Sequence, residues 1–240
     1  HKGHISLIKL SKKKCNKTLV SIYVNPIQFN RISDFRNYPR NLNNDIKILK
    51  KHKVDFLFIP HTKEILKNKN KKIVIKNKDK ILCAIHRKGH FEGVLEIMNR
   101  FVKIIFPKYI FLGEKDYQQL YLIKKFINKN FKVKVYSCKT VRDKNKVALS
   151  SRNNLLNKND LKKSSYITSL LLKLRKELKN NIAFKYKIKK IIKIINNIKN
   201  IKIEYLEIRN KNNLSKDYNQ SNFKIFLAYY NKNIRLIDNF

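Results

Sequence analysis

The sequence has few of the residues that mark fibrous, low-complexity or disulfide-rich proteins. Its 240 residues include only 4 Gly, 4 Pro and 3 Cys, and Trp is absent. This scarcity of glycine and proline excludes a collagen-like or Pro/Gly-rich chain. The cysteines, Cys15, Cys83 and Cys138, are odd in number and far apart, with no CxxC spacing. They argue against a disulfide scaffold or a cysteine-ligated zinc site and predict a reducing, cytoplasmic environment.

Long apolar runs are also absent. No run reaches the roughly 18 residues needed to span a membrane, and we expect no signal peptide at the start of the chain. Hydrophobic residues still make up 42% of the sequence. At about 100–200 residues per domain, the length predicts one or two domains with a real core. Because no apolar run is long enough to span a membrane, we also expect no membrane partner.

Acidic residues are scarce as well. The chain has 57 Lys+Arg against 16 Asp+Glu, a formal net charge of +41. The lysines occur almost everywhere and mix with many Asn and Ile, the residues that A/T-rich codons supply. A nucleic-acid-binding face would instead show clustered Arg with interleaved aromatic residues. We interpret the charge as a coding bias at exposed positions and expect no specific nucleic-acid partner, with a basic RNA-binding module as the alternative.

Short apolar runs alternate with amphipathic ones over the first two-thirds of the chain. This alternation predicts βαβ units and a mostly parallel sheet. The expected strands are residues 18–24, 54–59, 109–112 and 133–136, and the expected helices lie near 42–49, 91–105 and 117–128.

The pattern changes near Asn153. Two lysine-rich amphipathic helices are expected within residues 160–199, followed by strands over 201–208, 223–230 and 234–237. Helices followed by several strands predict a smaller α+β domain. We therefore expect an α/β domain over residues 1–155 and an α+β domain over residues 156–240.

The chain opens with His1-Lys2-Gly3-His4 at the start of an expected helix. Glycine lets a phosphate approach the backbone, and a helix N-terminus offers free N–H groups to an anion. The imidazoles can donate hydrogen bonds as charge builds on a phosphate. On its own the string could be a chance tetrapeptide or part of an expression tag.

Three further strings follow expected strands or their connecting loops. Gly113-Glu114-Lys115-Asp116-Tyr117-Gln118-Gln119 opens a helix at a strand end, where ligands of open α/β sheets bind. Leu149-Ser150-Ser151-Arg152-Asn153 offers hydroxyls and a guanidinium to phosphate oxygens. Asn25-Pro26-Ile27-Gln28 presents a neutral amide. Taken separately, they could be a capped helix start, a turn and an ordinary loop.

Together, the four strings resemble the pantothenate synthetase (pantoate–β-alanine ligase) family, nearly from end to end. The string from Gly113 to Gln119 is highly specific, whereas His-x-Gly-His is shared with the wider nucleotidyltransferase (HIGH-motif) superfamily. Further matching segments are residues 34–45, 54–60, 89–94, 140–142, 150–153 and 236–239.

The resemblance implies a Rossmann-like parallel sheet and an AMP-forming ligase of pantothenate biosynthesis. That ligase condenses (R)-pantoate with β-alanine through a pantoyl-adenylate and releases AMP and pyrophosphate. The implied catalytic residues are His1, His4, Lys115, Ser150, Ser151 and Arg152. The implied ATP-binding residues are His1, Lys2, Gly3, His4, Gly113, Glu114, Lys115, Asp116, Val141, Leu149, Ser150, Ser151 and Arg152. Gln28 and Gln119 would bind pantoate, with Gln28 also near β-alanine. The family further implies Mg²⁺, with ligands left open, and a cytoplasmic homodimer.

Some positions depart from the family's pattern. Family members have a strand and a Pro-Thr-Met-Gly-type turn before His-x-Gly-His, and this sequence begins at the first His. We therefore expect the first strand to be missing from the domain over residues 1–155. Lys2, Lys88 and Leu149 replace an acidic residue, Pro and Met, and we expect all three to be tolerated. We interpret His86 and His90 as structural.

A second enzyme class stays open at this point. It is an adenylyl transferase of the same superfamily that acts on phosphopantetheine or nicotinamide mononucleotide. The amides of Gln28 and Gln119, with the string around Lys115, favour the ligase.

Overall fold

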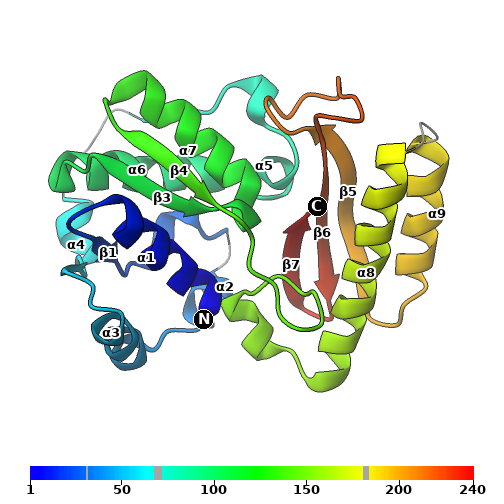
Figure 1. Cartoon of the computed structure of the whole chain (residues 1–240), viewed down its shortest axis with the longest axis horizontal. Coiled ribbons are helices and arrows are strands. Elements are labelled where there is room, and N and C mark those ends of the chain that lie inside the picture. Colours follow the sequence, from blue (N-terminus) through cyan, green and yellow to red (C-terminus); the bar gives the residue numbers. More distant parts are fainter. Residues whose placement is uncertain (31, 68–71, 181–183) are drawn as a thin grey trace. The chain divides into compact units, whose positions relative to one another are not determined.

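The computed structural model describes residues 1–30, 32–67, 72–180 and 184–240 (Figure 1). The chain forms two compact units. The first consists of His1–Glu114 and Gln119–Lys139, and the second of Lys115–Gln118 and Thr140–Phe240. The second unit thus includes a short segment from the middle of the chain. The domain boundary that we placed at residues 155/156 stays a prediction, and residues 181–183 of the expected helical region lie outside the described residues.

The first unit alternates helices with short strands. Its elements are α1 (Lys2–Lys14), β1 (Leu19–Ser21), η1 (Pro26–Gln28), α2 (Ile32–Arg36), α3 (Leu42–Lys51), β2 (Phe56–Phe58), α4 (Thr62–Ile65), η2 (Asn77–Asp79), α5 (Cys83–His86), α6 (His90–Ile105), β3 (Tyr109–Gly113), most of α7 (Tyr117–Asn130) and β4 (Lys134–Cys138).

All strand pairing described in this unit is parallel. β1 pairs with β2 from Leu19 opposite Phe56, and β3 pairs with β4 from Tyr109 opposite Lys134. These are separate two-stranded sheets in the described residues, with α1 packed on β3 and β4. β1 and β2 are shorter than expected. Pro60 follows β2 closely and lacks the N–H group that further pairing requires.

The end of α3 shows how the chain turns without glycine. Val54 N donates to Leu49 O and Lys53 N donates to Lys50 O, which is the hydrogen-bond pattern of a Schellman motif. Lys53 stands at the left-handed position with φ 50°, where glycine is usual.

The second unit is built on an antiparallel sheet. Its elements are η4 (Ser151–Leu155), α8 (Lys158–Asn180), α9 (Phe184–Asn196), β5 (Ile201–Asn210), β6 (Phe223–Asn231) and β7 (Ile234–Asn239), in the sheet order β5-β6-β7. Figure 1 shows α8 and α9 beside each other, with α9 packed on β5 and α8 on β6. The core between helices and sheet includes Leu171, Ile195 and Ile225, each 0% exposed. This is the α+β region expected at the C-terminus.

Among the residues that the structure describes, no helix combines the length and apolar character needed to cross a membrane.

Candidate active site

The string His1-Lys2-Gly3-His4 forms the first turn of α1. The His1 side chain caps the helix, with Nδ1 accepting a hydrogen bond from Gly3 N at 3.1 Å. The imidazole rings of His1 and His4 stack with their centroids 4.0 Å apart. The first turn carries no acidic residue, so its N–H groups and imidazoles are suited to an anion.

Gln28 ends η1, which is tied to α6 of the same unit. Asn25 caps η1 through Ile27 N and donates from Nδ2 to Gly93 O at 3.0 Å. A Cβ at Gly93 would lie 2.7 Å from Ile27 O, so only glycine allows this approach.

The main-chain carbonyl of Gln28 is itself held. His90 Nδ1 lies 2.8 Å and Arg87 Nη2 3.2 Å from that oxygen. Because a carbonyl only accepts, His90 carries its proton on Nδ1 and receives Arg87 Nη1 at Nε2, 2.9 Å away. These contacts agree with the structural interpretation of His90 made from the sequence.

Lys115 lies in the turn that follows β3. The strand ends at Gly113, η3 spans Glu114–Asp116, and α7 begins at Tyr117. The Lys115 ammonium is 3.8 Å from Asp116 Oδ1, and the Lys115 side chain is 19% exposed against 47% for Asp116. Cys138 pairs with Gly113 across β3 and β4. Burial and the charge of Glu114 raise the pKa of the Cys138 thiol, so the thiol stays protonated.

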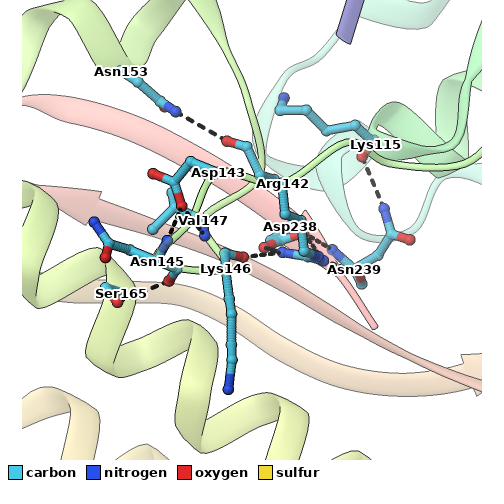
Figure 2. Close-up of polar contacts among 11 residues, drawn as sticks. Lys115, Arg142, Asp143, Asn145, Lys146, Val147, Asn153, Ser165, Asp238 and Asn239 are labelled. Carbon is cyan, nitrogen blue, oxygen red and sulfur yellow. Dashed lines mark hydrogen bonds and ion pairs between the residues drawn. The ribbon is translucent and has the colours of Figure 1, made fainter. Parts of the chain in front are cut away.

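Residues 140–149 form a hairpin that leads into η4. Arg142 pairs with Ala148, and Leu149 N donates to Val141 O at 3.0 Å. Asp143 Oδ1 fixes the tip by accepting from Asn145 N and Val147 N at 2.8 and 2.9 Å (Figure 2). Ser150 then caps η4 by accepting from Arg152 N.

A pocket within the second unit brings several of the predicted residues together. Lys115, Ser150 and Arg152 line it, alongside Asp238 of β7. Tyr229 is also in the lining, and burial raises its pKa to about 12, so it adds no negative charge there. The remaining lining residues are Val147, Ala148, Asn153, Thr168, Leu227, Arg235, Leu236 and Ile237. Cations and a hydroxyl in one pocket suit phosphate oxygens.

The other predicted residues are distributed as follows. Val141 lies in the hairpin. Leu149 and Ser151 are next to pocket residues in sequence, and Asp116 follows Lys115. The first unit holds His1, Lys2, Gly3, His4, Gln28, Gly113, Glu114 and Gln119. Within the described residues, no cluster of three or more His, Cys, Asp or Glu side chains suits a metal ion.

The fold and these motifs define a class: an α/β enzyme with a nucleotidyltransferase-type His-x-Gly-His helix start and a cationic pocket. Comparison with known proteins gives the family. The Pantoate-beta-alanine ligase family matches residues 1–240, and the chain belongs to that family. The predicted family and ligase class are thereby confirmed.

The relatives extend over the whole chain. Pantothenate synthetase of Leptospira interrogans is 37% identical over 244 residues, covering 100% of this chain and 86% of the relative. That of Clostridium botulinum is 38% identical over 248 residues, covering 100% and 87%.

Solved structures confirm the predicted fold class. Pantothenate synthetase from Thermus thermophilus superposes with a TM-score of 0.91 at 28% identity, covering 100% of this chain and 88% of that one. The pantoate-beta-alanine ligase from Francisella tularensis, complexed with beta-gamma ATP and beta-alanine, gives 0.84 at 36% identity, covering 100% and 85%.

Proposed function

We propose that the chain condenses pantoate with β-alanine at the expense of ATP, through a pantoyl-adenylate, with release of AMP and pyrophosphate. The observation that carries this proposal is the match of the whole chain to the ligase family. The relative solved with beta-gamma ATP and beta-alanine supports the choice of substrates.

In the first step, the pantoate carboxylate attacks the α-phosphorus of ATP, and pyrophosphate leaves. Negative charge then builds on the phosphate oxygens, and preorganised cations and N–H donors stabilise it. We assign this role to Lys115, Ser150 and Arg152 of the pocket and to Ser151 beside them. At the start of α1, His1, Lys2, Gly3 and His4 would contact the phosphates, with His4 as a hydrogen-bond donor. Gly113, Glu114, Asp116, Val141 and Leu149 would complete the ATP site.

In the second step, the β-alanine amine attacks the mixed anhydride and AMP leaves. We assign pantoate binding to Gln28 and Gln119. Their neutral amides can orient the pantoate carboxylate without quenching it as a tight ion pair with arginine would. Arg87 and His90 hydrogen-bond to the main-chain carbonyl of Gln28. These contacts fix the position of the Gln28 backbone, which supports its assignment to pantoate binding.

Mg²⁺ fits this chemistry as the companion of ATP. The ion is usually bound by substrate phosphates with one or two carboxylates and water. Asp116, a half-exposed carboxylate beside Lys115, is the side chain we assign to it. When bound, the ion would neutralise phosphate charge.

The family resemblance supports two further proposals, a homodimer and a cytoplasmic location. Cys15, Cys83 and Cys138 are free thiols, which agrees with a reducing compartment. Light scattering on the purified protein tests the dimer.

The central test is the dependence of ATP turnover on pantoate. We expect AMP and pyrophosphate to form only when pantoate and β-alanine are both supplied, and labelled pyrophosphate to exchange into ATP with pantoate alone. Nicotinamide mononucleotide and phosphopantetheine serve as control acceptors. ATP turnover that is indifferent to pantoate would exclude the ligase reaction.

A further inference from the structure

The last residues of β7 contact two segments that lie far apart in the sequence. Asn239 Nδ2 donates to the main-chain carbonyl of Lys115 at 2.9 Å, across 124 positions. Arg142, in the hairpin, donates from Nη1 and Nη2 to the carboxylate of Asp238 at 2.7 and 2.9 Å, across 96 positions. Figure 2 shows these contacts meeting at the end of the strand.

The Arg142 guanidinium uses both terminal nitrogens twice. Besides the bidentate pair with Asp238, Nη1 donates to Lys146 O and Nη2 to Asn239 O, each at 3.0 Å. The guanidinium carbon lies 4.8 Å from the centre of the Phe240 ring. Such a planar fork fixes orientation as well as distance, so the hairpin is held to β7 in one arrangement.

The β7 side of this anchor is buried and belongs to the antiparallel sheet. Asp238 is 9% and Asn239 4% exposed. Both pair with β6, opposite Leu227 and Phe226, and Asp238 Oδ1 also accepts from Asn239 N at 2.8 Å. The contacts therefore link the turn at Lys115 and the hairpin before Ser150 to one sheet.

The charge of Asp238 matters because this residue lines the same pocket as Lys115 and Arg152. A bare carboxylate there would repel phosphate oxygens. The pair with Arg142 offsets that charge.

We propose that Arg142, Asp238 and Asn239 are positioning residues for the adenylate-forming step. They hold Lys115 and the segment Leu149–Arg152 in place and screen the one carboxylate of β7 from the phosphates. This inference rests on the proposed function, because it assigns those segments to ATP.

The first test measures the two half-reactions separately in Asn239→Ala and Arg142→Ala. Loss of one hydrogen bond or of a charged fork should slow pantoate-dependent pyrophosphate exchange, or raise KM for ATP, by about tenfold or more. The rate at which added pantoyl-adenylate reacts with β-alanine should change by less than about twofold. A change of that size corresponds to less free energy than one hydrogen bond contributes.

The second test separates electrostatics from packing. In Arg142→Ala, the carboxylate of Asp238 is left bare, so adding Asp238→Asn should lower KM for ATP again by about threefold, since it removes one repulsive charge. A purely structural pair would give a double variant no better than Arg142→Ala.

Arg209→Lys is the matched control. Arg209 is a buried arginine of β5 that pairs with Glu207 and does not line the pocket. It should lose stability without changing KM for ATP. Unfolding alone lowers the amount of active enzyme and therefore slows both half-reactions equally. Equal slowing of both half-reactions in Asn239→Ala and Arg142→Ala would overturn the inference.

The outcome also distinguishes this inference from the proposed function. Wild-type protein without pantoate-dependent exchange would contradict the proposed function. Wild-type exchange that persists unchanged in Asn239→Ala would contradict the positioning role alone.

Discussion

The two units differ in how well their strands are covered. In the second unit, Ile225 and Leu227 of β6 are 0% and 1% exposed. In the first, Phe56 and Leu57 of β2 are 55% and 37% exposed. The chain therefore offers one leucine that is partly exposed to water, Leu57, and one that is fully buried, Leu171. Arg142 of the hairpin contacts Asp238 and Asn239 of β7, so the hairpin is anchored to the better packed sheet. The contrast between the units also gives matched pairs of variants.

Leu171→Ala should have the largest effect on stability. Leu171 is fully buried between helices and sheet, so its loss leaves a cavity and should lower the free energy of unfolding by about 2–5 kcal/mol. Leu57→Ala should cost less than about 1 kcal/mol because water already reaches that side chain. Urea unfolding curves measure both, and equal losses would contradict the contrast between the units.

Lys115→Ala should have the largest effect on activity. Removing a positive charge from the pocket should slow adenylate formation by about a hundredfold or more, measured as pantoate-dependent pyrophosphate exchange. Lys124→Ala is the control, because Lys124 is an exposed lysine of α7 and should exchange at the wild-type rate. Near-normal exchange in Lys115→Ala would remove this lysine from the catalytic residues.

Gly93→Ala tests the support of Gln28 in the first unit. The new Cβ would meet the backbone of Ile27 at 2.7 Å, and such overpacking should cost about 1–3 kcal/mol of unfolding free energy. It should also raise KM for pantoate. Gly113→Ala meets nothing within 4 Å and should leave stability nearly unchanged. A wild-type KM for pantoate in Gly93→Ala would show that η1 does not depend on this close approach.

Asp160→Asn should have a small effect that depends on pH. The hydrogen bond from Lys232 lowers the pKa of the Asp160 carboxyl below its ordinary 3.8. A carboxyl whose pKa is lowered in the folded state stabilises the fold at pH values above its unfolded-state pKa. This stabilisation is lost as the pH falls through the folded-state pKa. The variant should be less stable than wild type near neutral pH, and the gap should narrow as the pH falls below 3.8.

Asp55→Asn gives the counterpart in the first unit. There, the hydrogen bond from Thr18 N, with Lys17 nearby, lowers the pKa of the Asp55 carboxyl. Thermal unfolding across pH should show the same sign. A gap that stays constant down to acid pH would contradict both assignments.

Much of the fold could be predicted because it is encoded in local patterns. The strands expected over 201–208, 223–230 and 234–237 correspond to β5, β6 and β7, and the helix expected over 91–105 corresponds to α6. The lengths of β1 and β2 could not be predicted, because they depend on what each strand pairs with.

The candidate site divides in the same way. Lys115, Ser150 and Arg152 could be chosen from their motifs, and the structure places them in one pocket. The anchor formed by Arg142, Asp238 and Asn239 could not, because its partners are 96 and 124 positions apart. In the sequence, Arg142 and Asp238 belong to segments that match the family, but nothing there assigns them a role.

Lys53 connects the composition of the chain to its heat tolerance. With only 4 Gly in 240 residues, a lysine stands where the end of α3 requires a left-handed backbone. That conformation costs an L-residue about 1–2 kcal/mol, and glycine in the same place escapes the penalty. Replacing Lys53 by glycine should therefore raise the melting temperature by a few degrees, measured by calorimetry. The scarcity of glycine thus affects backbone torsion as well as composition.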